Sequence, residues 1–173
     1  MKTAIIYGVT GQDGSYLSEL LLSKQYTVYG ITRRSSLPNT TRINHLLTQK
    51  QFHLIQGDVT DFGSIYRLLN EVQPDEVYNL AAQSHVGTSF EQPSLTWNVT
   101  GQGCMNILEV IRQMGNRPRF YQASSSEMFG DQYNLDNNRE KYQDEKTTFA
   151  PQSPYAISKL AAHHSVALYR RSY

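Results

Sequence analysis

Three glycines in seven residues follow the first apolar run of this chain, in the sequence Gly8-Val-Thr-Gly11-Gln-Asp-Gly14. The run before them, Thr3 to Tyr7, is short and apolar, as in a strand buried on both faces. After them, leucines recur at helical spacing. Glycines at such a strand-to-helix turn let backbone N–H groups approach a pyrophosphate, whose charge the helix N-terminus stabilises. The spacing differs from Gly-x-Gly-x-x-Gly, so the prediction of a dinucleotide site rests on the position of the turn; an ordinary glycine turn is the alternative.

Strand and helix patterns alternate along the rest of the chain, which predicts a parallel sheet with right-handed crossovers. We expect an α/β, Rossmann-like, doubly wound domain over residues 1–173, because this length suffices for one core. A polar segment, 131–153, interrupts the alternation and is expected to be a loop or lid. The predicted strands are 3–7, 27–32, 52–56, 76–80 and 119–124, and the predicted helices follow Gly14 and cover 62–72, 95–114 and 154–173.

The composition argues against several classes of partner. Lys and Arg number 16 and Asp and Glu 15, for a formal net charge of +1, which gives no case for nucleic acid or a membrane surface. No apolar run approaches the ~20 residues of a membrane span, and the N-terminal run is too short for a signal peptide. The single cysteine, Cys104, lies among apolar residues and is expected in the core rather than as a nucleophile. We therefore expect a soluble, cytoplasmic protein.

The end of the second predicted strand bears on which dinucleotide binds. An acidic residue is usual there when the ligand is NAD, because it binds the ribose 2′-hydroxyl. Here the sequence is Arg33-Arg34-Ser35-Ser36. Guanidinium groups favour a 2′-phosphate through bidentate, charge-assisted hydrogen bonds, so the sequence predicts NADP. The alternative is a pair of solvated surface arginines.

Two further strand ends offer contacts to the same cofactor. Asp58 and Val59 follow the third strand, and the Asp58 carboxylate suits either an adenine amino group or the N-cap of the next helix. Leu80-Ala81-Ala82-Gln83-Ser84 follows the fourth strand. Its residues are small or polar where a cofactor must cross the carboxyl edge of the sheet.

A hydroxyl, a phenol and an amine form the predicted catalytic group. Tyr155 and Lys159 lie four residues apart on a predicted helix, so their side chains share a face. Tyrosine is a poor base at its usual pKa of about 10, but a nearby ammonium group and a nicotinamide cation would stabilise the phenolate. Ser125 can hydrogen-bond the substrate hydroxyl or the carbonyl that replaces it. These three residues suffice for hydride transfer to and from a carbinol.

Glu127 indicates chemistry beyond oxidation. Once a sugar carbon becomes a ketone, the adjacent C–H is acidic, and a positioned carboxylate can remove its proton. A hydroxyl can then leave the next carbon, and the stored hydride can return to the resulting alkene. The alternative is that Glu127 caps a turn.

The histidines give weaker signals. His85 follows Ser84 near the predicted cleft, and either a packing or hydrogen-bonding role or a substrate contact is open to it. His163 and His164 lie on different faces of a predicted helix with no Cys or Asp ligands nearby, so we expect no metal site.

Several motifs together resemble one family. They are Gly8-Val-Thr-Gly-Gln-Asp-Gly-Ser-Tyr-Leu17, Arg33-Arg-Ser-Ser36, Gln73-Pro-Asp-Glu-Val-Tyr-Asn-Leu-Ala-Ala-Gln-Ser-His-Val86, Phe120-Tyr-Gln-Ala-Ser124 and Ser153-Pro-Tyr-Ala156. In these residues the chain is similar to the GDP-mannose 4,6-dehydratases of the extended short-chain dehydrogenase/reductase superfamily. The matches run through the whole chain, and Gly-Gln-Asp-Gly and Arg-Arg-Ser-Ser are specific to this branch.

The resemblance implies conversion of GDP-D-mannose to GDP-4-dehydro-6-deoxy-D-mannose, with tightly held NADP recycled in each turnover. It implies that Tyr155 is the base at the C4 hydroxyl, Lys159 its partner, and Glu127 the carboxylate at C5 and C6. Ser125 stands where the family has a threonine, and Ser84, His85, Ser125 and Glu127 are the expected substrate contacts. With the positions above, the implied cofactor-binding set is Gly8, Thr10, Gly11, Gln12, Asp13, Gly14, Arg33, Arg34, Ser35, Ser36, Asp58, Val59, Leu80, Ala81, Ala82, Gln83, Ser84, Tyr155 and Lys159.

The chain also departs from the family. Leu95 replaces a tyrosine near the cofactor, the 131–153 loop is longer, and the C-terminal sugar-nucleotide lobe has no counterpart. We therefore expect the NADP-binding part without a substrate-binding domain. A 4-keto-6-deoxy reductase, a nucleotide-sugar epimerase and a non-catalytic NADP-binding module are the alternatives. By family likeness we expect a homo-oligomer, either a dimer through the helices 95–114 and 154–173 or a tetramer.

Overall fold

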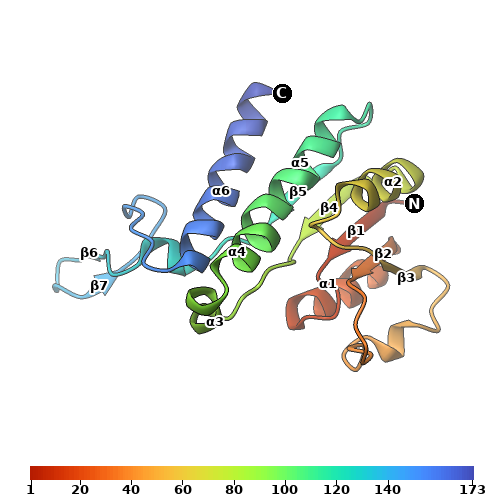
Figure 1. Cartoon of the computed structure of the whole chain (residues 1–173), viewed down its shortest axis with the longest axis horizontal. Coiled ribbons are helices and arrows are strands. Elements are labelled where there is room, and N and C mark those ends of the chain that lie inside the picture. Colours follow the sequence, from red (N-terminus) through yellow and green to blue (C-terminus); the bar gives the residue numbers. More distant parts are fainter.

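A computed structural model describes all residues, 1–173, and its centre is a five-stranded parallel sheet (Figure 1). The strands lie in the order β3-β2-β1-β4-β5, so the chain crosses over after β3 to the other side of β1. This arrangement confirms the doubly wound, Rossmann-like prediction. The strands are β1 (Thr3–Tyr7), β2 (Thr27–Thr32), β3 (Phe52–Gln56), β4 (Glu76–Asn79) and β5 (Arg119–Gln122).

The strand register brings the functional loops together. Tyr7 of β1 pairs with Ile31 of β2 and Asn79 of β4, and Asn79 pairs with Gln122 of β5. Each of these residues is at or next to the end of its strand. Because parallel strands point the same way, the segments after β1, β2, β4 and β5 leave from one edge. We call this the carboxyl edge and the opposite one the amino edge.

Helices cover both faces of the sheet, and each face has its own core (Figure 1). The larger cluster packs the sheet against α2 (Phe62–Val72) and α5 (Gly103–Gln113). The smaller one includes Leu21 of α1 (Gln12–Ser23), with Ile43 and Leu46 of the segment after β2. These apolar periodicities were visible in the sequence because each helix buries one stripe.

The last helix, α6 (Pro154–Ser172), lies beside α5 (Figure 1). Cys104 and Leu108 of α5 pack against Ala162 of α6. Burial raises the pKa of the Cys104 thiol to about 12. The prediction that Cys104 is a core residue is therefore confirmed. None of the helices is long and apolar enough to cross a bilayer.

The predicted helix over 95–114 is not uniform. The helical stretch consists of α4 (Pro93–Thr96), a π-helical segment η2 (Trp97–Gln102) and α5. Such a widened turn depends on packing rather than on residue spacing, so periodicity does not reveal it. The predicted strands 76–80 and 119–124 extend one and two residues beyond the ends of β4 and β5.

Short elements in the connections were not predicted. They include the 3₁₀ turns η1 (Asn44–Leu46) and η3 (Ser126–Phe129), the helix α3 (Val86–Glu91), and the strands β6 (Asn134–Leu135) and β7 (Lys141–Tyr142). The last two form an antiparallel hairpin within 131–153 that projects from the body (Figure 1). The expected loop therefore has a small sheet of its own, between the end of η3 and the start of α6.

Candidate active site

The glycine turn after β1 is shaped by close backbone approaches. Gly8 has a φ of +82°, and a Cβ there would lie 2.9 Å from the carbonyl carbon of Leu80, beyond β4. At Gly14 a Cβ would lie 2.5 Å from the Gly8 oxygen. Side chains at these two positions would collide with backbone atoms. The glycines therefore bring the first turn of α1 against the end of β1, as a backbone-lined phosphate site requires.

The N-terminus of α1 has no side-chain cap. Gly11 occupies the N-cap position, and no side chain accepts a hydrogen bond from the first turn. The free N–H groups and the helix dipole both favour an anion. The first turn also contains Asp13, whose negatively charged carboxylate favours cations rather than anions as neighbours. The geometry fits a pyrophosphate bound through backbone N–H groups.

The two arginines after β2 are exposed and unpaired. Neither Arg33 nor Arg34 forms an ion pair, and Ser35 and Ser36 beside them are also exposed. Every ion pair of the chain involves other residues. Two uncompensated guanidinium groups at the carboxyl edge are available to an anionic ligand.

Asp58 lies at the end of β3 but does not cap the following helix. Its Oδ1 accepts hydrogen bonds from the backbone N–H of Thr60 at 2.9 Å and from the Thr60 hydroxyl at 2.8 Å. Asp61 is the N-cap of α2, and its side chain accepts from Gly63. The alternative role suggested for Asp58 therefore belongs to Asp61. Val59, the next residue, is buried against Gly103.

Hydrogen bonds fix the segment after β4. The Leu80 N–H donates to the Tyr7 carbonyl at 3.0 Å, which continues the β1–β4 pairing. The Gln83 N–H donates to Thr100 Oγ1, and its amide Nε2 donates to Thr96 Oγ1 at 3.0 Å. The side chain of Gln83 thus ties this segment to the helical stretch after α3. Ala81 and Ala82 are half-buried, and Ser84 is exposed.

His85 has a structural role in this chain. Its Nδ1 accepts a hydrogen bond from the Thr88 N–H at 3.1 Å, so the ring caps α3. This contact bears out the hydrogen-bonding interpretation of His85. A substrate contact through its other nitrogen stays a prediction.

Tyr155 and Lys159 occupy the first turns of α6. Ser153 caps this helix by accepting from the Ala156 N–H, and Pro154 follows at the first helical position. Pro suits that position because its missing N–H would have no helical partner. The Lys159 Nζ lies 5.9 Å from the centre of the Tyr155 ring, and both side chains are buried. The local sequence Ser153-Pro154-Tyr155 therefore fixes where α6 begins, and with it the position of the Tyr155–Lys159 pair.

Lys159 is held at the end of β5. Its Nζ donates a 2.7 Å hydrogen bond to the Ala123 carbonyl, and its residue is only 3 % exposed. Burial lowers the pKa of Lys159 to about 8. At pH 7 most of these amines are still charged. A charged amine at this distance can stabilise a phenolate on Tyr155.

Ser125 and Glu127 lie in the turn after β5. Ser125 is the N-cap of η3, and its Oγ accepts from the Glu127 N–H at 3.2 Å. Ser125, not Glu127, therefore caps the turn. The Glu127 carboxylate is exposed and forms no hydrogen bond or ion pair. An unpaired carboxylate is available for proton transfer.

The structure thus places the predicted residues on the connections that follow the five strands and in the first turns of α6. It directly joins the glycine turn to residues 80–81, and α6 to the end of β5 through Lys159. One neighbour was missed: His163, whose Nδ1 lies 2.9 Å from Ser124 Oγ. Its position four residues after Lys159 was the available signal, because that spacing places both on one helix face.

The fold and this edge define a Rossmann-type domain of the short-chain dehydrogenase/reductase kind. Among solved structures, a UDP-glucose 4-epimerase of Thermus thermophilus, in complex with NAD, aligns with a TM-score of 0.81 and 29 % identity, covering 99 % of this chain and 51 % of that one. The UDP-Glc/GlcNAc 4-epimerase of Campylobacter jejuni aligns at 0.87 with 20 % identity, over 99 % and 50 %. The second likeness shows the fold alone.

Sequence comparison narrows the class. The family described as GDP-mannose 4,6 dehydratase matches residues 5–173. A GDP-mannose 4,6-dehydratase of Yersinia enterocolitica is 48 % identical over 100 % of this chain and 47 % of its own length. GDP-mannose 4,6 dehydratase 2 of Arabidopsis thaliana is 47 % identical over 99 % and 47 %. The chain belongs to the GDP-mannose 4,6-dehydratase family, and it spans about half the length of these curated relatives.

Proposed function

We propose that this chain is the NADP-binding part of a GDP-mannose 4,6-dehydratase and carries its catalytic residues. The reaction is the conversion of GDP-D-mannose to GDP-4-dehydro-6-deoxy-D-mannose with loss of water. The observation that carries the proposal is the unpaired Glu127 carboxylate in the turn after β5, a segment that Lys159 contacts through the Ala123 carbonyl. A reductase or epimerase needs the Tyr-Lys pair but no such carboxylate. The similarity to relatives named GDP-mannose 4,6-dehydratase also supports the proposal.

The cofactor site fits NADP in both of its anionic parts. The turn from Gly8 to Gly14 and the uncapped N-terminus of α1 suit the pyrophosphate. Arg33 and Arg34 suit a 2′-phosphate, since no acid of the chain neutralises them. The Thermus relative is a complex with NAD, so nicotinamide dinucleotide is the shared class and the arginines select NADP. NADP would supply the oxidation at C4 and the reduction at C6.

Different residues of this chain then carry out the individual proton transfers. Tyr155, as the phenolate, removes the proton of the C4 hydroxyl, and the Lys159 ammonium stabilises that phenolate. Ser125 donates its hydroxyl hydrogen to the oxygen at C4, because its Oγ already accepts from the backbone N–H of Glu127. The Glu127 carboxylate removes the proton at C5 and passes it to the departing C6 hydroxyl, so that water leaves. The proton that Tyr155 takes from the C4 hydroxyl balances the one that C5 would take up when the hydride returns to C6.

The remaining features of the proposal concern binding and assembly. Ser84 and His85 lie on the β4 side of the edge, where they would contact the sugar. The proposed substrate is GDP-mannose. The proposed assembly is a homo-oligomer, either a dimer or a tetramer. We propose a cytoplasmic location and no role in binding nucleic acid or membrane.

Proton NMR of the chain incubated with NADP and GDP-mannose tests the proposal. The C6 methyl doublet of the 6-deoxy product is expected. No methyl signal from a folded chain that binds NADP would contradict the proposal for these 173 residues and would favour a non-catalytic NADP-binding module. A change at C4 without a methyl signal would favour a reductase or epimerase instead.

A further inference from the structure

His163 lies at a junction between α6 and the turn that carries Glu127. Tyr155, Lys159 and His163 follow one another at four-residue intervals, so they share a face of α6. Two of them contact consecutive residues after β5. Lys159 Nζ donates to the Ala123 carbonyl at 2.7 Å, and His163 Nδ1 lies 2.9 Å from Ser124 Oγ. The helix is therefore attached to the start of the turn at two adjacent points.

The same imidazole also reaches the end of the turn through aromatic contacts. The His163 ring lies edge-on to Phe149, with centroids 5.6 Å apart, and Phe149 packs on Phe129 at 5.1 Å. Phe129 is the last residue of η3. Beside it, the Ala150 N–H donates to the Met128 carbonyl at 3.0 Å. One side chain thus links α6 to both ends of the four-residue turn.

This arrangement matters because Glu127 has no anchor of its own. Its carboxylate forms no hydrogen bond, so the backbone of the turn alone sets its position. Burial lowers the pKa of His163, and the neighbouring His164 and Arg170 act in the same direction. The ring is therefore neutral at pH 7 and able to accept from or donate to Ser124. Loss of this contact would free the start of the turn without removing any proposed catalytic group.

We propose that His163 is a positioning residue that, through Ser124 and Phe149, holds Ser125 and Glu127 in place relative to Tyr155 and Lys159. The inference rests on the proposed function. It assigns His163 no contact with substrate or cofactor. A displacement near 1 Å of a group that acts in the reaction can lower turnover by about 100-fold.

Variants at adjacent positions provide a matched test. His163→Phe keeps an aromatic ring near Phe149 but removes the hydrogen bond, and His163→Asn restores a polar atom at the position of Nδ1. His164→Phe is the control, since His164 also lies 5.6 Å from Phe149 and forms no hydrogen bond with the turn. We expect His163→Phe to lower kcat at least about tenfold with KM nearly unchanged. His163→Asn should recover most of kcat, and His164→Phe should stay within twofold.

A second measurement does not require turnover. In amide NMR of the 173-residue chain, His163→Phe and Ser124→Ala should each shift the signals of Ser125 and Glu127, and His164→Phe should not. Absence of turnover in the unsubstituted chain would count against the proposed function, while these shifts would still support the positioning role. Equal effects of His163→Phe and His164→Phe on kcat or on the amide signals would overturn it. So would unchanged Ser125 and Glu127 signals in His163→Phe.

Discussion

The amino and carboxyl edges of the sheet differ in whether particular charged side chains have partners within the protein. At the amino edge Glu76 has several partners: it accepts from Tyr78 at 2.8 Å, from Tyr26 at 3.1 Å and from Lys2 at 3.3 Å. At the carboxyl edge Arg33, Arg34 and Glu127 have no charged partner. Pairing satisfies a charge within the protein, whereas an unpaired charge is available to a ligand.

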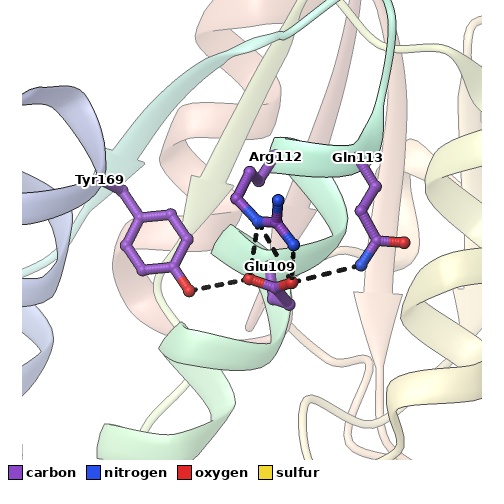
Figure 2. Close-up of polar contacts among 4 residues, drawn as sticks. All are labelled: Glu109, Arg112, Gln113 and Tyr169. Carbon is purple, nitrogen blue, oxygen red and sulfur yellow. Dashed lines mark hydrogen bonds and ion pairs between the residues drawn. The ribbon is translucent and has the colours of Figure 1, made fainter. Parts of the chain in front are cut away.

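The contact between α5 and α6 shows the same contrast along one helix. Near the amino edge, the Glu109 carboxylate accepts from Tyr169 at 3.0 Å and from Arg112 and Gln113 (Figure 2). Near the other end of α6, Lys159 has only a backbone carbonyl as its partner. The C-terminal part of α6 therefore makes a structural contact alone, whereas its N-terminal part contacts the segment after β5 and also brings the Lys159 amine to the site. The predictions below test this division between structural and functional charges.

Replacing Glu127 with Gln should have the largest effect. The amide cannot accept the C5 proton, so formation of the C6 methyl group should fall by about 100- to 10,000-fold, the range for general acid–base catalysis. Turnover followed by NMR measures this, with the unfolding midpoint checked in parallel. Glu145→Gln, at another exposed and unpaired glutamate, is the matched control. Unchanged methyl formation in Glu127→Gln would remove the case for a dehydratase.

Gly14→Ala should disrupt the turn itself. Its Cβ would lie 2.5 Å from the Gly8 oxygen and 2.7 Å from the Val9 Cα, both backbone atoms that cannot move independently. We expect the free energy of unfolding to fall by about 1–3 kcal/mol, as for other overpacked sites, and NADP binding to be lost. Gly115→Ala is the control, because nothing lies within 4 Å of a Cβ there. Equal stability and NADP affinity for the two variants would contradict the close approach.

The double variant Arg33→Ala/Arg34→Ala should bind NADP more weakly and should still fold. Loss of charge-assisted hydrogen bonds to the 2′-phosphate should raise the Kd for NADP about 10- to 100-fold and change that for NAD little. Titration calorimetry of both dinucleotides measures the difference. Arg67→Ala removes an exposed arginine of α2 and should change neither value. If the unsubstituted chain binds NAD and NADP equally, the arginines do not select the cofactor.

The sequence predicted the framework better than the connections. The bounds of β1, β2, β3 and α2 agree with the structure because each depends on local periodicity. The π-helical segment at 97–102 and the β6–β7 hairpin were missed, since both depend on packing and turn geometry.

The candidate site divides in the same way. The glycine turn and the Tyr155–Lys159 spacing are short-range patterns, and they were visible in the sequence. The Ser124–His163 contact joins residues 39 positions apart. From the sequence, His163 is weighed only as a metal ligand. Its spacing from Lys159 predicts that the two share a helix face, but nothing local predicts that this face meets the end of β5. Which side chains support a site therefore depends on the fold, even where the reacting groups can be predicted from motifs.

Glu109→Gln should have the smallest effect, confined to stability and dependent on pH. Hydrogen bonds from Arg112 and Tyr169 lower the pKa of Glu109 to about 2 in the folded chain, below its usual value of 4.5. The unfolded chain binds the proton more readily, so the stabilisation is fully present above about pH 4.5 and is lost as the pH falls toward 2. Because the pair is partly exposed, it contributes at most about 1 kcal/mol. For a chain of this size that shifts Tm by about 2–4 °C.

Thermal unfolding at several pH values measures this difference. At pH 7 Glu109→Gln should unfold a few degrees below the unsubstituted chain, and the gap should narrow as the pH is lowered below 4.5. Glu71→Gln replaces an exposed helical glutamate without an ion pair. Its Tm should equal that of the unsubstituted chain at every pH measured. A gap for Glu109→Gln that stayed constant from pH 7 to pH 3 would show that packing, rather than the charge of Glu109, joins α5 to α6. The contrast between the two edges would then rest on Glu76 alone.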